Sequence, residues 1–339
     1  MSYSDSNSPR IVERRSFGCG TVIVVLFLMT LAAGIGLILG AAAGQVNVTT
    51  DSKVEERYHS LSKTATDKIA IIEIEGTIIE GDGSVKKQID HVREDKSVKA
   101  VIVRVNSPGG TVTGSDYMYH YLVKLREERK IPIVVSMGSL AASGGYYVSM
   151  CVGDEPDTIF AEPTTWTGSI GVVIPHYDAS QLADKVGIDE DSVKSHRLKL
   201  MGSPLKEMTA EERAIFQTLV DESFTGFKEI VKSGRPKFRN NPADLDKVAT
   251  GQIFTADQAI QSGLVDKKGF IEEAVARAIE LAKLDKDKVK VVKYHEPLGF
   301  LGAFLESSTK SRRSELEIFL QMATPRAYYL FAWPGAGKS

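Results

Sequence analysis

The sequence predicts an α/β fold with a largely parallel sheet. Runs rich in valine and isoleucine, typical of buried strands, occur at 69–74, 100–106 and 131–136. Helical stretches separate these runs, at 84–95 and 115–130. Strands that are each separated by a helix form βαβ units, so the three runs are expected to lie parallel in one sheet.

Beyond residue 136 the pattern becomes less regular. A short helix is expected over 142–151, followed by short strands at 158–160 and 169–174. A long helix is expected from Thr209 to Lys232, because Glu212 follows Thr209 at the spacing of a capping box and Gly234 and Pro236 end the pattern. A second helix is expected to begin near Thr255.

Composition limits the classes of function. The chain has 339 residues, of which 42% are apolar and 25% charged, as in a folded domain with a packed core. Its formal net charge of −2 gives no basic excess, so nucleic acid is not an expected partner. The two cysteines, Cys19 and Cys151, are expected to be unpaired, and the six histidines are scattered without an HExxH pair. No metal or cofactor is expected.

An uncharged, apolar run extends from Thr21 to Ala43. At 1.5 Å per residue, about 23 helical residues span a hydrocarbon core of roughly 30 Å. A cleaved signal peptide and a buried core helix are the alternatives, but the run is longer than a typical signal sequence. The expectation is one uncleaved transmembrane helix over 21–43.

Flanking charge sets the expected orientation of this anchor. Arg10, Arg14 and Arg15 precede the run, whereas the following side has no basic residue before Lys53. Basic residues favour the cytoplasmic side, so 1–20 are expected to be cytoplasmic and the rest extracytoplasmic. The expected organisation continues with a tether over 44–67, a folded domain over 68–297 and a C-terminal extension over 298–339.

Three turns rich in glycine and serine each follow or adjoin a predicted strand, at 106–110, 141–147 and 167–171. Catalytic groups gather at the carboxyl ends of parallel strands, so the turns are expected to converge. Ser143 is the candidate nucleophile because its small neighbours admit a substrate backbone and a helix begins there. Gly109 and Gly110 offer backbone N–H groups for an oxyanion. A small-residue helix contact and a simple tight turn are the alternative interpretations.

A serine hydroxyl needs a base to become a nucleophile. The chain has no G-x-S-x-G sequence of the kind that accompanies a histidine triad. A lysine can serve where burial favours its neutral amine. Lys199 lies between two leucines in a loop before the long helix and is the candidate, although a solvated surface lysine is the alternative.

Five motifs, in this order and spacing, resemble the signal peptide peptidase A family of serine peptidases in its short, single-repeat form. They are NSPGG, MGSLAASGGYY, TGSIGV, HRLKLMGSPLKEMT and GQIFTADQAIQSGLVD, and a weaker match covers TPRAYYL near the C-terminus. The resemblance implies a Clp/crotonase-like fold of repeated ββα units. It also implies a homo-oligomer in which neighbouring subunits complete the site.

The resemblance also implies roles for individual residues. Ser143 would be the nucleophile, Lys199 the general base and Ser169 a support for the lysine. Gly109, Gly110 and Gly144 are the predicted oxyanion residues. The expected function is a membrane-anchored endopeptidase that degrades remnant signal peptides and other apolar, extended peptides. A crotonase-like enzyme acting on acyl-CoA and a catalytically silent membrane scaffold remain alternatives.

Overall fold

A computed structural model describes residues 54–295 and 327–330 of the chain. The chain separates into two units, Met1–Ser52 and Lys53–Ser339, and every described residue belongs to the second. The transmembrane helix expected over 21–43 lies outside the described residues. Among the helices of the described part, none combines the length and apolar character needed to cross a bilayer.

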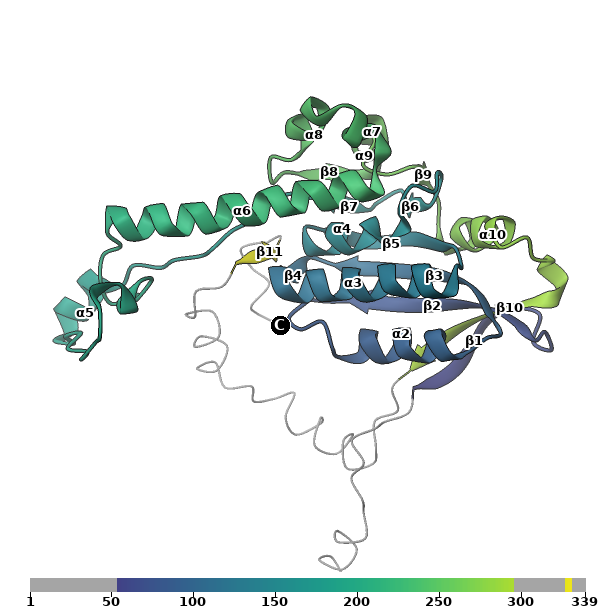
Figure 1. Cartoon of the computed structure of the whole chain (residues 1–339), viewed down its shortest axis with the longest axis horizontal. Coiled ribbons are helices and arrows are strands. Elements are labelled where there is room, and N and C mark those ends of the chain that lie inside the picture. Colours follow the sequence, from purple (N-terminus) through teal and green to yellow (C-terminus); the bar gives the residue numbers. More distant parts are fainter. Residues whose placement is uncertain (1–53, 296–326, 331–339) are drawn as a thin grey trace, which may run out of the picture. The chain divides into compact units, whose positions relative to one another are not determined.

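One large sheet organises the described residues (Figure 1). Its path runs β1-β10-β2-β3-β5-β6-β9, and β7 joins it through β5 and carries β8 at its outer side. All neighbours on the path from β10 to β9 pair in parallel, while β1 pairs antiparallel with β10 and β8 antiparallel with β7. The strands are β1 (Glu55–Leu61), β2 (Asp67–Glu75), β3 (Val98–Ser107), β5 (Ile133–Ala142), β6 (Ile159–Ala161), β7 (Trp166–Gly168), β8 (Ile253–Thr255), β9 (Lys267–Lys268) and β10 (Val289–His295).

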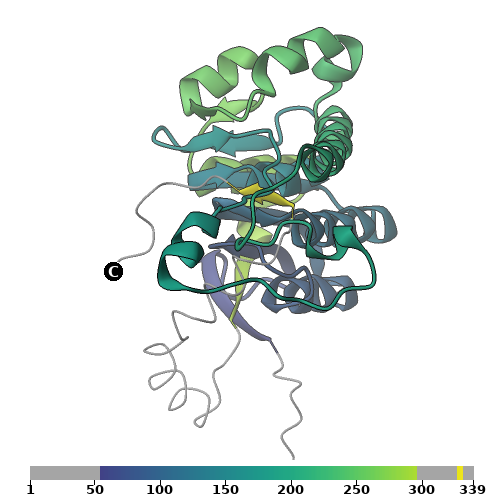
Figure 2. The same ribbon diagram turned by 90° about the vertical axis from the view of Figure 1, so that its left-hand side faces the viewer.

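A separate two-stranded sheet lies beside the large one. It pairs β4 (Gly109–Thr111) antiparallel with β11 (Tyr328–Leu330), which comes from the far end of the chain. Figure 2 shows β11 as the yellow strand in front of the large sheet.

Helices cover both faces of the large sheet. They are α2 (Ser84–Glu94), α3 (Val112–Arg129), α4 (Gly144–Ser149), α5 (Ser180–Val186), α6 (Ala210–Gly234), α7 (Pro236–Asn240), α8 (Pro242–Val248), α9 (Ala256–Ser262) and α10 (Ile271–Leu281). Short 3₁₀ turns add η1 (Met150–Val152), η2 (Arg197–Leu200) and η3 (Lys286–Lys288).

Alternate side chains of β2 belong to two hydrophobic cores, one on each face of the sheet. Ala70, Ile72 and Ile74 are buried with residues of α2, α3, α4 and α6, whereas Ile69 and Ile71 are buried with residues of α10. Successive strand residues point to opposite faces, so a strand covered on both sides reads as a continuous apolar run. The predicted α/β class with a mostly parallel sheet is therefore confirmed.

Two expected segments differ in the structure. The tether expected over 44–67 contains β1. This edge strand has its first five residues exposed, so β1 lacks the apolar pattern that predicts a strand. The strand expected over 169–174 is reduced to an isolated bridge at Val173, because the ordered pairing lies just before it, in β7.

The long helix is confirmed as α6. Thr209 and Glu212 form the predicted capping box: the Thr209 hydroxyl accepts from the Glu212 amide at 3.2 Å, and the Glu212 carboxylate accepts from the Thr209 amide at 3.1 Å. Lys206 contacts the same buried carboxylate at 2.6 Å. These contacts fix where α6 begins.

A projecting arm, residues 174–222, leaves the body of this unit. It comprises α5, η2 and the first half of α6, and no residue between Val172 and Phe224 belongs to either described core cluster. Figure 1 shows α5 and the start of α6 well away from β4 and α4.

Candidate active site

Ser143 occupies the turn between β5 and α4. Its amide donates to the Gly168 carbonyl at 2.8 Å, and its carbonyl accepts from the Tyr147 amide at 2.8 Å. The first bond ties the turn to the neighbouring strand β7, and the second starts α4. Ser143 is thus fixed at the carboxyl end of a central strand, where the sequence predicted it.

The backbone of Ser143 is strained. Its φ of 54° and ψ of −113° lie in a region that side-chain-bearing residues rarely adopt, at a typical cost of about 1–3 kcal/mol. Its hydroxyl oxygen is buried and has no hydrogen-bond partner among the described residues. A strained strand-to-helix turn holding an unpaired serine hydroxyl is the geometry expected of a nucleophile.

Ser169 lies beside Ser143. Ala142 and Gly168 are paired residues of β5 and β7, so the two serines follow the two strands at the same level. Ser169 also has a positive φ, 53°, and its amide donates to the Gln252 carbonyl at 2.7 Å. The predicted nucleophile and its predicted support are therefore brought together.

Backbone crowding requires glycine at both residues of the 109–110 turn. Gly109 has a φ of +94°, and a Cβ there would lie 2.5 Å from the Gly144 amide nitrogen. A Cβ on Gly110 would lie 1.7 Å from the Ile78 carbonyl oxygen. The glycines bring β4 into direct contact with the start of α4.

One predicted oxyanion donor is already engaged. The Gly109 amide donates to the Ser107 hydroxyl at 3.0 Å, and that hydroxyl donates to the Gly76 carbonyl at 2.6 Å. The Gly109 amide therefore stabilises the turn and is not available to bind an oxyanion. The Gly110 and Gly144 amides are the remaining candidates, and Gly144 occupies the first position of α4, where helix amides lack intrahelical acceptors.

A strand from the C-terminal region lies along this turn. Tyr328, Tyr329 and Leu330 of β11 face Thr111, Gly110 and Gly109 in antiparallel register. On its other side Tyr328 exchanges two backbone hydrogen bonds with Val173, at 2.9 and 3.1 Å. The Tyr329 carbonyl oxygen would lie 2.1 Å from a Cβ on Gly109. An extended backbone thus fits between β4 and Val173 with a carbonyl at the glycine turn.

The Tyr329 ring fills an aromatic pocket. It stacks on Tyr147 with ring centroids 5.1 Å apart and contacts Phe227 at 4.5 Å. Its hydroxyl donates to the Ser223 carbonyl at 2.9 Å, and burial raises its pKa well above the ordinary value. The Tyr147 hydroxyl donates to Asp116 at 2.7 Å. This pocket can hold a large aromatic side chain of a strand bound at the turn.

Lys199 lies on the arm. It belongs to η2, its side chain is exposed, and among the described residues it makes no side-chain hydrogen bond or ion pair. Arg197, two residues earlier, pairs through both terminal nitrogens with Glu211 at the start of α6. The single chain does not bring Lys199 to Ser143, so the pairing of these two residues stays a prediction.

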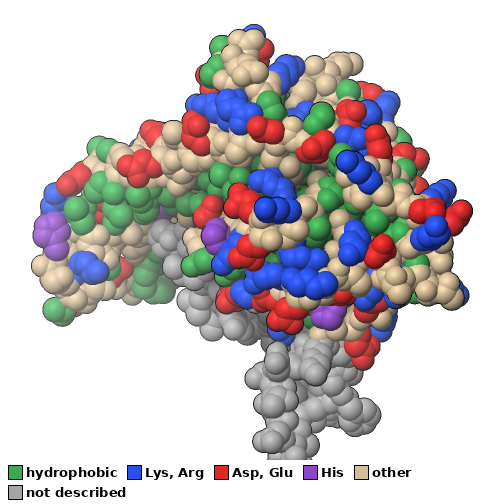
Figure 3. Space-filling model, turned by 45° about the vertical axis from the view of Figure 1, so that its right-hand side comes forward, with side chains coloured by type: hydrophobic (Ala, Val, Ile, Leu, Met, Phe, Trp, Pro, Cys, Tyr) green, Lys and Arg blue, Asp and Glu red, His purple; other side chains and the backbone are tan. Residues whose placement is uncertain are grey.

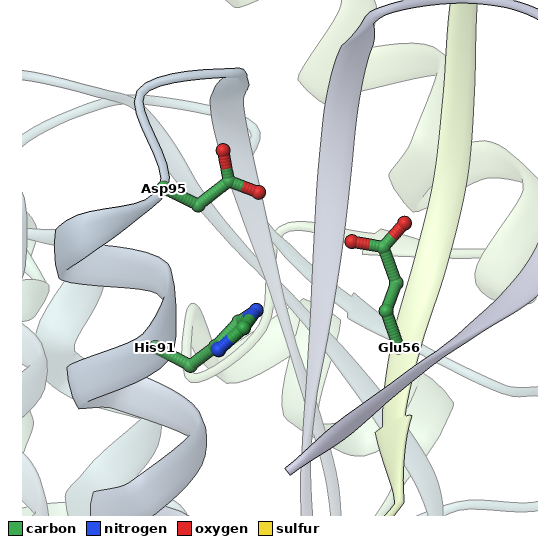
Figure 4. Close-up of side chains that lie close together, drawn as sticks. All are labelled: Glu56, His91 and Asp95. Carbon is green, nitrogen blue, oxygen red and sulfur yellow. The ribbon is translucent and has the colours of Figure 1, made fainter. Parts of the chain in front are cut away.

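A separate cluster joins Glu56, His91 and Asp95, whose possible ligand atoms lie within 4.8 Å of one another (Figure 4). The Lys68 ammonium contacts Glu56 at 2.5 Å and Asp95 at 2.9 Å, and Lys290 adds a contact to Glu56 at 3.5 Å. Two lysines balance the two carboxylates, so the charge that would attract a metal ion is already neutralised. The cluster fits a structural role that ties β1 to α2.

Comparison with known proteins identifies the family. Residues 125–285 match the family model described as peptidase family S49. A putative protease of Synechocystis is 39% identical over 69% of this chain and 82% of its own length. A putative signal peptide peptidase SppA of Enterococcus faecium is 36% identical over 64% of this chain and 61% of its own. Protease 4 of Salmonella typhi is 34% identical over 81% of this chain, which spans only 45% of that longer protein.

These matches establish that the chain belongs to peptidase family S49. The predicted resemblance to the signal peptide peptidase A family is confirmed, and a serine peptidase is the class of enzyme that the family supports. Peptides are the substrates that such a family implies.

Several features of the site escaped sequence reasoning. The strain at Ser143 and Ser169 depends on how β5 and β7 pair, and β11 lies more than 200 residues from its partner β4. The glycine run in AASGGYY could have signalled the crowding between α4 and β4, because close backbone approach requires glycine.

Proposed function

We propose that the protein is a membrane-anchored serine endopeptidase in which Ser143 is the nucleophile and Lys199 the general base. The observation that carries the proposal is the buried, unpaired Ser143 hydroxyl on a strained turn, with the Gly109–Gly110 turn packed against the Gly144 amide. The family match favours this function over acyl-CoA chemistry and over a silent scaffold.

The chemistry follows from the proposed roles. The Ser143 oxygen attacks the scissile carbonyl carbon while the Lys199 amine takes the hydroxyl proton. The Gly110 and Gly144 amides stabilise the oxyanion, a contribution of about 3–4 kcal/mol for one donor in known cases. Lys199 then gives the proton to the leaving amine, and water hydrolyses the acyl-enzyme. Ser169 keeps the lysine amine oriented toward Ser143.

The substrate binds as an extended strand. β11 supports this mode because its backbone lies between β4 and Val173 with the Tyr329 carbonyl beside the glycine turn. Strand addition of this kind takes affinity from main-chain hydrogen bonds and specificity from alternate side chains. The pocket around Tyr147 and Phe227 selects a large apolar or aromatic side chain.

A second copy of the chain supplies Lys199. The arm carries η2 away from the body, and its exposed apolar side chains offer a surface for another subunit (Figure 3). Those exposed by more than half are Tyr177, Leu182, Val186, Ile188 and Val193. Burying such a surface in a homo-oligomer places the Lys199 loop of one subunit at the Ser143 turn of the next.

The anchor over 21–43 places the catalytic unit at the extracytoplasmic face of a membrane, where remnant signal peptides and other apolar peptides are released. The test is hydrolysis of an apolar, quenched-fluorescence peptide by the full chain in detergent or lipid. Ser143→Ala and Lys199→Ala should each abolish turnover with unchanged circular dichroism. Turnover by either purified variant would contradict the dyad.

A further inference from the structure

A hollow of about 910 Å³ lies beyond the end of β4, next to the place where β11 enters the site. The part of its lining that carries charge and aromatic character comprises Glu80, Asp82, Tyr117 and Tyr121, which together form what we call the acidic hollow. Ala327, the residue before β11, lines the same hollow, and its carbonyl accepts from the Val112 amide at 3.2 Å. A strand bound along β4 therefore has its N-terminal side directed into the acidic hollow.

The loop that carries the two carboxylates is held rigidly. The Thr111 hydroxyl donates to the Ile79 carbonyl at 2.7 Å, and the Thr111 amide donates to the Ile78 carbonyl at 2.8 Å. Gly81 packs so closely that a Cβ there would lie 2.1 Å from the Cβ of Tyr117. The end of β4 thus fixes the position of Glu80 and Asp82.

Within the described ranges 54–295 and 327–330, no neighbour neutralises either carboxylate. Glu80 and Asp82 are exposed, and no hydrogen bond or ion pair from the described residues reaches either one. Lys86, the nearby lysine, is paired with Asp90. The start of α3 adds a positive dipole worth about half a charge, which two carboxylates exceed. The net charge of the described residues that line the acidic hollow is negative, so this lining disfavours an anionic ligand.

Aromatic rings complete the environment for a cation. Tyr117 and Tyr121 stack with ring centroids 6.0 Å apart, and Tyr117 is 52% exposed. Lys86 Nζ lies 5.2 Å from the Tyr121 ring centroid and occupies that face, so the exposed Tyr117 ring is the one available to a ligand cation. Tyrosine faces attract lysine and arginine side chains, whose apolar stems also cover the ring.

We propose that the acidic hollow is a subsite for a basic side chain of the peptide substrate. It binds a lysine or arginine one or two positions before the residue that takes the place of Ala327. This inference rests on the proposed peptidase function and adds a charge preference on the N-terminal side of the apolar stretch that is cut. Exposed carboxylates give modest pairing energies, so the preference is about threefold to tenfold in kcat/KM.

The experiment compares apolar peptides that carry one arginine, scanned along the N-terminal side, with peptides that carry norleucine at the same position. The full chain should cleave the arginine peptide about threefold to tenfold better at one or two adjacent positions only. In Glu80→Gln/Asp82→Asn the ratio of the two kcat/KM values should fall to about one. Charge reversal, Glu80→Lys/Asp82→Lys, should shift the preference to a glutamate peptide.

A matched control removes two exposed carboxylates elsewhere. Glu272→Gln/Asp287→Asn changes the net charge equally on and beside α10, and it should keep the arginine preference. Binding of the labelled peptides to Ser143→Ala, measured by fluorescence anisotropy, should show the same preference for arginine without turnover.

The outcomes separate the two proposals. Cleavage of all peptides without any arginine preference would overturn the subsite and leave the peptidase function intact. Failure to cleave any peptide would count against the peptidase function itself. An arginine preference that emerges only after Arg326→Gln would assign the acidic hollow of the wild-type chain to its own C-terminal region, and would overturn a role in substrate selection by the wild-type protein.

Discussion

Ser143 and Ser169 follow neighbouring parallel strands at the same level, and both have positive φ angles, 54° and 53°. The Ser143 amide donates to the Gly168 carbonyl, so the turn that carries one serine is tied to the residue before the other. This coupling accounts for two strained residues side by side at the carboxyl end of the sheet. The strain is retained because both turns are fixed by backbone hydrogen bonds.

The Ser143 hydroxyl should reduce stability while it enables activity. Because the hydroxyl is buried without a partner, Ser143→Ala should raise the free energy of unfolding by about 1 kcal/mol. Ser143→Gly should raise the free energy of unfolding by at least about 1 kcal/mol beyond Ser143→Ala, since glycine tolerates a positive φ. Chemical denaturation of the three proteins measures both steps. A loss of stability in both variants would show that the hydroxyl has a favourable partner.

Lys199 should act across subunits. If one chain supplies Ser143 and another Lys199, mixing Ser143→Ala with Lys199→Ala chains by co-expression should restore part of the peptidase activity. Each variant alone should be inactive. Separately purified, unmixed chains provide the control, and sedimentation confirms that mixed oligomers form. Continued inactivity of a confirmed mixed oligomer would contradict a shared site.

Gly110 should tolerate no side chain. A Cβ there would meet the Ile78 carbonyl at 1.7 Å, so Gly110→Ala must displace β4 from Ile78 or from β11. We expect a destabilisation of about 2–3 kcal/mol and loss of turnover. Gly226→Ala is the control, because a Cβ in that part of α6 meets nothing within 4 Å and should stabilise the helix by about 0.5–1 kcal/mol. Thermal unfolding distinguishes the two substitutions.

The contacts of Asp95 should make stability depend on pH in the acid range. Burial opposes ionisation of Asp95, but hydrogen bonds from Lys68 and Ser97 outweigh it and lower its pKa to about 2. A pKa that is lower in the folded chain contributes stability above about pH 4, and that contribution is lost as pH falls toward 2. At neutral pH the contribution is about 1–2 kcal/mol.

Asp95→Asn should therefore be less stable than the wild type by that amount at pH 7, and the difference should shrink between pH 4 and pH 2. Denaturant unfolding at several pH values measures it. Asp287→Asn, which removes an exposed carboxylate, should give a small difference at every pH. A constant difference for Asp95→Asn across the range would refute the assigned pKa.

Strong local patterns predicted most of the central sheet. β2, β3 and β5 carry buried valine and isoleucine on both faces, and the Thr209–Glu212 capping box marks the start of α6, so sequence alone located them. β1 was not predicted, because it is an exposed edge strand whose partner, β10, lies more than 200 residues away. Pairing between distant segments leaves no local periodicity in either one.

The site was predictable in part. Ser143, Ser169 and the glycine turn could be placed at one edge of the sheet, because the carboxyl ends of parallel strands meet there. The engagement of the Gly109 amide by Ser107 depends on a side-chain rotamer, which residue spacing does not encode. The role of Lys199 came from resemblance, and its position on the arm explains why no local pattern pointed to it.

Covalent labelling gives a direct test of Ser143 as the nucleophile. The full chain is treated with a fluorophosphonate probe in detergent or lipid, and the adduct is located by peptide mass spectrometry. We expect one adduct, on Ser143, that is absent from Ser143→Ala and strongly reduced in Lys199→Ala. Labelling of a different serine, with Ser143 unmodified in a preparation that cleaves peptides, would show that Ser143 is not the nucleophile.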